Sequence, residues 1–242
     1  MKKIYNDIQH TLAFLLLMIA TACEDFVTIE PPQTTLSTTT VFQDESTARA
    51  AVNRIYIDMV QYTQSFSSGI TSLNNMGGLA SDEFYNYDSF NDMAPFASNE
   101  VTPFNSAINA AWNQIYNLIY QANAILDGLE KSNLSANARG PLEGEAHFMR
   151  AYLHFLLVSY WGDVPWIETT DYNLNTKASR TLASQVLGNI ISDLLLAKEK
   201  LPAESTLRIR PTKSATAALL ARVYLSMGNY LEAEQQATEV IN

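Results

Sequence analysis

The sequence predicts an all-α protein whose helices are joined by long irregular loops. Three observations carry this prediction. Residues 105–131 repeat apolar side chains at the helical period, residues 138–160 keep apolar side chains on one side, and a Gly228-Asn229 turn joins two further helical stretches. The chain has 242 residues and 47% of them are hydrophobic, which is enough for one sizeable core.

The first 22 residues are predicted to be a signal peptide. Lys2 and Lys3 precede an apolar run at 12–20, and two small residues at 21–22 come before Cys23, the only cysteine of the chain. The run is far shorter than the ~20 apolar residues that span a bilayer. A cysteine directly after the expected cleavage point is typical of a bacterial lipoprotein, so we expect lipidation of Cys23. The alternative is an ordinary signal peptide followed by a chance cysteine.

Residues 23–43 are expected to form a lipidated, extended tether, because the segment is rich in Thr and Pro and lacks periodicity. The helical domain is expected over 44–242. Its first helix begins near Asp44, with Asp44 or Ser46 as the cap. The side chains expected on its buried face are Ala50, Ala51, Val52, Ile55, Met59 and Val60.

Residues 65–104 show no sustained period, and a loop of this length is commonly functional or disordered. Within it, the segment 79–92 interleaves aromatic and short polar side chains, as sugar sites do, because flat rings pack on the C–H faces of sugars while amides and carboxylates bind hydroxyls. The predicted ligand-binding residues are Asp82, Tyr85, Asn86, Tyr87, Asp88 and Phe90. The alternative is that these aromatic rings anchor the loop to the helical body.

The two long helical segments also carry candidate residues. Trp112 falls on the buried stripe of 105–131 and is expected in the core, whereas Trp161 and Trp166 flank a Gly-Asp-Val-Pro turn and are expected to pin it. A further two helices are expected at about 181–200 and 211–227.

One stripe of the segment 138–160 resembles a metal site at first sight. Its members are Glu143, His147, Arg150 and His154. An HExxH motif is absent, and the Arg150 cation within the stripe would repel a metal ion. We therefore expect ion pairs that support packing, with Arg150 joined to a carboxylate such as Glu143 or Asp163.

Other chemistry finds little support in the sequence. No nucleophile motif or phosphate loop occurs, so no catalytic residue, metal or cofactor is predicted. The net charge of −10, without a basic run, argues against nucleic acid as a partner.

The final helix pair is similar to a tetratricopeptide repeat, in which antiparallel helices stack into a superhelix. Tyr230 is expected to pack back over the turn. Close approach of the two helices is attributed to the small residues Ala218, Ala221, Ala233 and Ala237. Because the sequence ends within a helix, we expect it to be the N-terminal part of a longer protein.

Taken in order, the segments resemble the SusD/RagB family of outer-membrane nutrient-binding lipoproteins from Bacteroidetes. The segments that carry the resemblance are CEDF (23–26), FQDESTARAAVNRIY (42–56), WNQIYNLIYQANAIL (112–126), GEAHFMRAYLHFLLVSYWGDVPW (144–166) and RPTKSATAALLARVYLSMGNYLEA (210–233). The fourth is the most specific of them.

The resemblance implies an all-α, tetratricopeptide-like fold and a non-catalytic function. It implies a surface lipoprotein of the outer membrane that captures oligosaccharides and passes them to a SusC-like, TonB-dependent transporter. Three alternatives remain: a peptide-binding RagB-like member, a secreted glycoside hydrolase with paired carboxylates, and a tetratricopeptide-type scaffold that binds only proteins.

Overall fold

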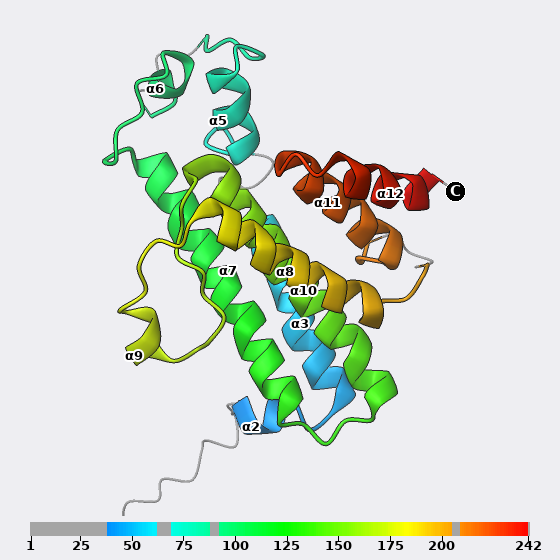
Figure 1. Ribbon diagram of the computed structural model, residues 1–242. Coiled ribbons are helices and arrows are strands. Elements are labelled where there is room, and N and C mark those ends of the chain that lie inside the picture. The colour runs from blue at the N-terminus through cyan, green and yellow to red at the C-terminus, as the bar shows by residue number, and fades with distance from the viewer. Residues whose placement is uncertain (1–37, 62–68, 88–91, 205–208, 242) are drawn as a thin grey trace, which may run out of the picture. The chain divides into compact units, whose positions relative to one another are not determined.

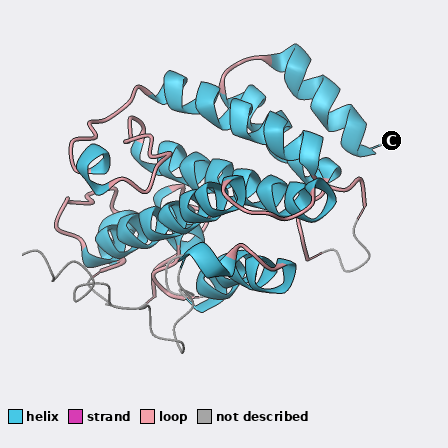
Figure 2. Cartoon of the chain, turned by 90° about the horizontal axis from the view of Figure 1, so that it is seen from below, coloured by secondary structure: helices cyan, strands magenta, loops and turns pink. Residues whose placement is uncertain are grey.

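The computed structural model describes residues 38–61, 69–87, 92–204 and 209–241. Within these ranges helices are joined by loops (Figure 2). One isolated antiparallel bridge pairs Val164 with Thr181. The helices are α2 (Thr38–Val41), α3 (Glu45–Gln61), α5 (Leu73–Ala80), α6 (Ala94–Ala97), α7 (Ser106–Glu130), α8 (Ala136–Trp161), α9 (Tyr172–Asn175), α10 (Ala183–Lys200), α11 (Lys213–Ser226) and α12 (Tyr230–Ile241). The predicted all-α class is confirmed.

The core lies between the long helices. α8 packs against α7 on one side and α10 on the other, α3 packs against both α7 and α8, and α11 lies against α10 and α12 (Figure 1). Asn105 caps α7, because its side-chain oxygen accepts hydrogen bonds from the amides of Ala107 and Ile108 at 3.0 and 3.1 Å. None of the helices in the described ranges has the length and apolarity needed to cross a bilayer.

The compact part of the chain begins earlier than the predicted domain boundary at residue 44. The short helix α2 lies within the segment 23–43, for which an extended tether is predicted, and Phe42 after it is buried. The Phe42 ring packs directly on the backbone of Gly128 in α7. The last residues of the predicted tether are therefore part of the folded body, and residues 23–37 lie outside the described ranges.

Two side chains predicted on the buried face of α3 are exposed. Val52 and Ile55 are fully buried as predicted, but Ala50 and Val60 face solvent. The buried stripe runs instead through Ala48 and the two confirmed residues, at i, i+4 and i+7, and both exposed residues lie off that stripe.

The predicted helix pair at the end of the sequence forms as α11 and α12, with Gly228 in the turn at φ +77°. Ala233 is buried against α11, which agrees with the close approach expected from small residues. Ala218 is exposed, and Tyr230 is 71% exposed, so the prediction that Tyr230 packs over the turn is wrong. As the first residue of α12, Tyr230 lies on its solvent side.

Candidate functional site

The predicted binding loop begins where α5 ends. Phe84 packs on Gly78, where an added Cβ would come within 2.3 Å of the ring, and the Phe84 and Glu83 amides both donate to the Gly78 carbonyl at 2.9 Å. Asp82 adopts a positive φ of 61°, which turns the chain back over α5. Phe84 therefore anchors the loop to α5, as the alternative interpretation of the aromatic residues in this loop predicts.

The tyrosines of the same loop behave differently. Tyr85 is 76% exposed and Tyr87 is 92% exposed, and their ring centroids lie 4.6 Å apart with the planes tilted by 58°. Asn86 between them is half-buried. The predicted residues Asp88 and Phe90 lie outside the described ranges. The exposed pair fits an aromatic platform, and contact of the loop with a ligand stays a prediction.

The helices α5 and α6 lie near the start of α7 and the end of α8 (Figure 1). A cavity of about 550 Å³ is lined by residues of these four helices and lies next to the loop. Ala80, which ends α5, is part of its wall, so the loop leaves from the rim of the cavity. The aromatic and polar side chains of its wall are Phe96, Thr102, Asn109, Trp112, Tyr160, Trp161 and Arg180. We call this space the aromatic cavity.

The aromatic side chains of the cavity are held in defined positions. Trp112 and Trp161 meet edge to face with ring centroids 5.4 Å apart. The Tyr160 hydroxyl donates to the Leu73 carbonyl at 2.7 Å, which joins the end of α8 to the start of α5. The Arg180 guanidinium lies over the Trp112 ring, with its carbon 5.9 Å from the ring centroid.

A second cavity of about 290 Å³ shares Trp112 and continues along α7 past Tyr116 and Tyr120. The Tyr116 hydroxyl donates to the Pro165 carbonyl at 2.8 Å, and burial raises the pKa of this hydroxyl, only partly offset by the Arg180 charge. Trp112 is half-buried: it packs against the core, as predicted, and also lines both cavities. The sequence contains a signal for an aromatic face on α7, which is the four-residue spacing of Trp112, Tyr116 and Tyr120.

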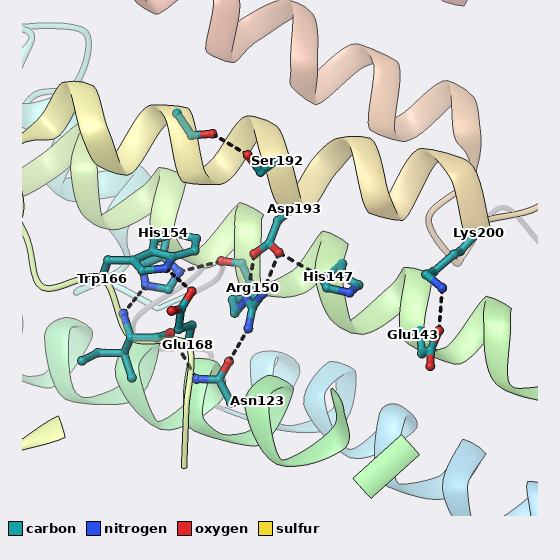
Figure 3. A network of polar contacts seen from close by, with 12 residues as sticks. Asn123, Glu143, His147, Arg150, His154, Trp166, Glu168, Ser192, Asp193 and Lys200 are labelled. Atoms are coloured by element: carbon teal, nitrogen blue, oxygen red, sulfur yellow. Dashed lines mark hydrogen bonds and ion pairs between the residues drawn. The ribbon is translucent and has the colours of Figure 1, made fainter. Parts of the chain in front are cut away.

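Figure 3 shows a buried polar network between α7, α8 and α10. Arg150 donates to both carboxylate oxygens of Asp193 at 2.7 Å and to the amide oxygen of Asn123 at 2.9 Å. His147 Nδ1 lies 2.9 Å from Asp193. The prediction that Arg150 is joined to a carboxylate is confirmed, but the carboxylate is Asp193 and neither of the two candidates, Glu143 and Asp163. Glu143 instead pairs with Lys200 at 2.7 Å and with Arg139 at 3.1 Å.

His154 extends the network to the segment after the Gly-Asp-Val-Pro turn. Its Nδ1 lies 3.0 Å from the Arg150 carbonyl and therefore donates, whereas its Nε2 accepts from the Ile167 amide at 3.3 Å. The Trp166 ring stacks on the imidazole with centroids 4.0 Å apart. Burial lowers the pKa of His154 to about 4, so the ring is neutral at physiological pH.

The polar network has a structural rather than a catalytic role. Burial alone would raise the pKa of Asp193, but the hydrogen bonds from Arg150 and His147 outweigh burial and hold the pKa below its usual range. A carboxyl held ionised in this way cannot serve as a general acid. Among the described residues, no group of three or more His, Cys, Asp or Glu side chains is placed to hold a metal ion.

Known proteins resemble this chain in sequence and in structure. Residues 25–225 match the SusD-like family described as "Starch-binding associating with outer membrane". SusD-like protein P2 of Formosa agariphila is 30% identical over 244 residues, covering 97% of this chain and 46% of the relative.

Two solved structures extend the comparison. A laminarin-binding SusD-like protein aligns with a TM-score of 0.72 at 21% identity, covering 82% of this chain and 44% of that one. A structure with a xylogluco-oligosaccharide aligns with a TM-score of 0.68 at 26% identity, covering 81% and 40%.

The chain spans about half the length of the curated relatives that it matches, since it covers 46% of the P2 protein. The family match extends over most of the sequence and includes every helix from α2 to α10. The fold of the solved relatives agrees with the helical arrangement described above. On these grounds the chain belongs to the SusD-like family.

Proposed function

We propose that the protein captures oligosaccharides at the end of the bundle formed by α5, α6 and the loop that follows α5. The observation that carries the proposal is the pair of adjacent tyrosines, Tyr85 and Tyr87, which are exposed by 76% and 92%. They belong to the loop that follows Ala80, a residue in the wall of the aromatic cavity. Exposed rings of this kind offer a rigid apolar surface to the C–H face of a sugar. A relative that is 26% identical is described with a xylogluco-oligosaccharide, which supports a sugar as the ligand.

The cellular setting belongs to the same proposal. The protein is lipidated at Cys23, attached to the outer membrane and facing the cell exterior, and it passes the captured sugar to a SusC-like, TonB-dependent transporter. The description of the matched family, which names association with the outer membrane, supports the location. Binding rather than catalysis is proposed, because the described residues that line the aromatic cavity include no Asp or Glu to act as an acid or a nucleophile.

Titration calorimetry of the full-length protein with xyloglucan and laminarin oligosaccharides tests the proposal. We expect Tyr85→Ala and Tyr87→Ala each to weaken binding by about threefold to tenfold, because each removes one ring that packs on the sugar. The matched control is Tyr172→Ala, which removes a tyrosine of similar exposure (77%) from α9.

Three results would contradict the proposal or part of it. Unchanged affinity in both loop variants would remove these tyrosines from the site. Binding of peptides in place of every oligosaccharide would favour the RagB-like alternative. Cleavage of the bound sugar by the purified protein would show that it is an enzyme.

A further inference from the structure

We propose that the aromatic cavity is a subsite for a negatively charged sugar unit, a uronate or a sulfate ester, and that Arg180 supplies the opposite charge. The inference rests on the proposed function, because it specifies the class of glycan that the same end of the bundle takes. It adds a charge requirement that the exposed tyrosines of the loop do not impose.

The first argument is the state of the Arg180 charge. The guanidinium donates one hydrogen bond, from Nη1 to the Asp163 carbonyl oxygen, and no ion pair joins Arg180 to a carboxylate of the described residues. A guanidinium has five N–H donors, so several remain available in this group. By contrast, Arg150 and Arg210 each pair with a buried carboxylate, Asp193 and Glu145, at 2.7 Å.

The second argument is that Arg180 is fixed in place before any ligand arrives. The next residue, Thr181, forms the antiparallel bridge with Val164 through hydrogen bonds of 3.0 and 3.2 Å. The guanidinium is also placed over the Trp112 ring, an arrangement favoured by cation–π attraction. A cation that is already positioned loses little side-chain entropy when it binds an anion.

The third argument is the chemistry of the wall. Trp112, Trp161 and Tyr160 offer ring surface, which suits the apolar face of a sugar. Asn109 uses its amide nitrogen to donate to the carbonyls of Pro103 and Asn105, both at 3.1 Å, which leaves its side-chain oxygen available to accept from a hydroxyl. The volume of about 550 Å³ lies within the range of roughly 300–1,000 Å³ that is usual for small-molecule sites.

These features select an anionic sugar over the alternatives. A neutral sugar would use the rings and Asn109, and its hydroxyl oxygens would accept from the guanidinium, but the positive charge of Arg180 would stay unpaired. A carboxylate or a sulfate offers paired oxygens that match the planar fork of a guanidinium, which gives both attraction and orientation. The net charge of the chain is −10, which repels an acidic glycan, and the charge of Arg180 offsets this repulsion locally.

The experiment measures charge preference in matched pairs of ligands. One pair is oligogalacturonate and its full methyl ester, and the other is κ-carrageenan oligosaccharide and its desulfated form. Affinities of the full-length protein are measured by calorimetry for the wild type, for Arg180→Gln, and for Arg222→Gln as the control. Arg222 is exposed on α11 and, like Arg180, has no ion pair within the described ranges, so its replacement removes the same charge elsewhere.

We expect the wild type to bind the anionic member of at least one pair about tenfold tighter than the neutral member, with the preference falling as salt rises. Arg180→Gln should bring the two members to within about twofold of each other, and Arg222→Gln should leave the preference unchanged. The pair that shows the preference identifies the anion as a carboxylate or a sulfate.

Equal binding of charged and neutral members by the wild type would overturn this inference and leave glycan capture standing. A uniform loss for both members in Arg180→Gln would overturn it as well, because the residue would then only shape the cavity. The absence of binding to all of these ligands and to the xyloglucan and laminarin oligosaccharides would instead contradict the proposed function itself.

Discussion

His154 is a neutral, buried imidazole whose two nitrogens are both used. One nitrogen donates to the Arg150 carbonyl of its own helix and the other accepts from the Ile167 amide, so protonation would turn an acceptor into a donor that faces an N–H group. Unfolded histidine takes up a proton near pH 6.5, but in the folded protein burial delays protonation to about pH 4. Between these values the unfolded chain therefore binds more protons than the folded one.

The pH dependence of stability follows from that difference. The free energy of unfolding should be highest above pH 6.5 and should fall as the pH drops, with a loss from His154 of about 3 kcal/mol by pH 4. Urea denaturation followed by circular dichroism between pH 4 and 7.5 measures the slope. His154→Asn, which cannot titrate, should show a shallower slope even if it is less stable at neutral pH. Equal slopes would assign the pH dependence to other groups.

The partner of Arg150 shows a limit of sequence reasoning at this scale. The helical period correctly places Glu143, His147, Arg150 and His154 along one side of α8, but the periodicity of one helix contains no information about the helix packed against it. The carboxylate that Arg150 binds is Asp193 of α10, 43 residues away in the sequence. Nearness in the sequence suggests Glu143 and Asp163 as partners, whereas the packing of α8 against α10 selects a distant carboxylate.

The helices themselves were predictable in proportion to their length. The predictions at 105–131, 138–160 and 181–200 agree with α7, α8 and α10, because each contains several helical turns with a repeated apolar stripe. The helices α6 and α9 have four residues each, about one turn, which is too short for a period to be recognised. α5 contains two adjacent glycines, and its second, Gly78, allows Phe84 to pack on the helix.

The contact between Phe42 and Gly128 joins the start of the folded body to α7, and it can be tested directly. A methyl group added at Gly128 would come within 2.1 Å of the Phe42 ring. We expect Gly128→Ala to destabilise the protein by about 1–3 kcal/mol, because the ring has to move out of a packed site.

The control is Gly188→Ala in α10, where an added Cβ meets no atom within 4 Å. This replacement should be neutral or stabilise by roughly 0.5–1 kcal/mol, as alanine favours the helix interior over glycine. Thermal and urea unfolding measure both variants. A Gly128→Ala protein as stable as the control variant would mean that the Phe42 ring is not held against α7.

For the whole molecule, the prediction concerns how the protein is attached to the membrane. If Cys23 carries the lipid, Cys23→Ala should move the protein from the membrane fraction to the soluble fraction, because no other lipid chain would hold it at the bilayer. Fractionation of cells that produce each form, followed by immunoblotting, measures the distribution. Serine at the same position is a second variant with a similar size. Retention of both variants in the membrane fraction would place the anchor elsewhere.

The sequence predicted the class of fold, the family and the exposed pair of tyrosines more fully than it predicted the cavity. Tyr85 and Tyr87 could be singled out because aromatic side chains in an aperiodic polar segment have no helix face to occupy. The aromatic cavity combines residues from α5, α6, α7, α8 and the segment before α10. The residues of the cavity are far apart in the sequence, so their proximity could not be predicted from it. Arg180 in particular lies in no periodic segment or motif that would have indicated a role in binding.

The bridge between Val164 and Thr181 also has a practical consequence. The bridge joins the two ends of the segment that carries α9. A substitution within that segment is therefore expected to have little effect on the packing of α8 and α10. Lys177 is exposed in this segment, three residues before Arg180. Cys23 is the one cysteine among these 242 residues, and lipid would occupy it, so Lys177→Cys would add one free thiol to this part of the protein for a fluorescent dye. Such a dye would report on events at the aromatic cavity while the bundle remained undisturbed.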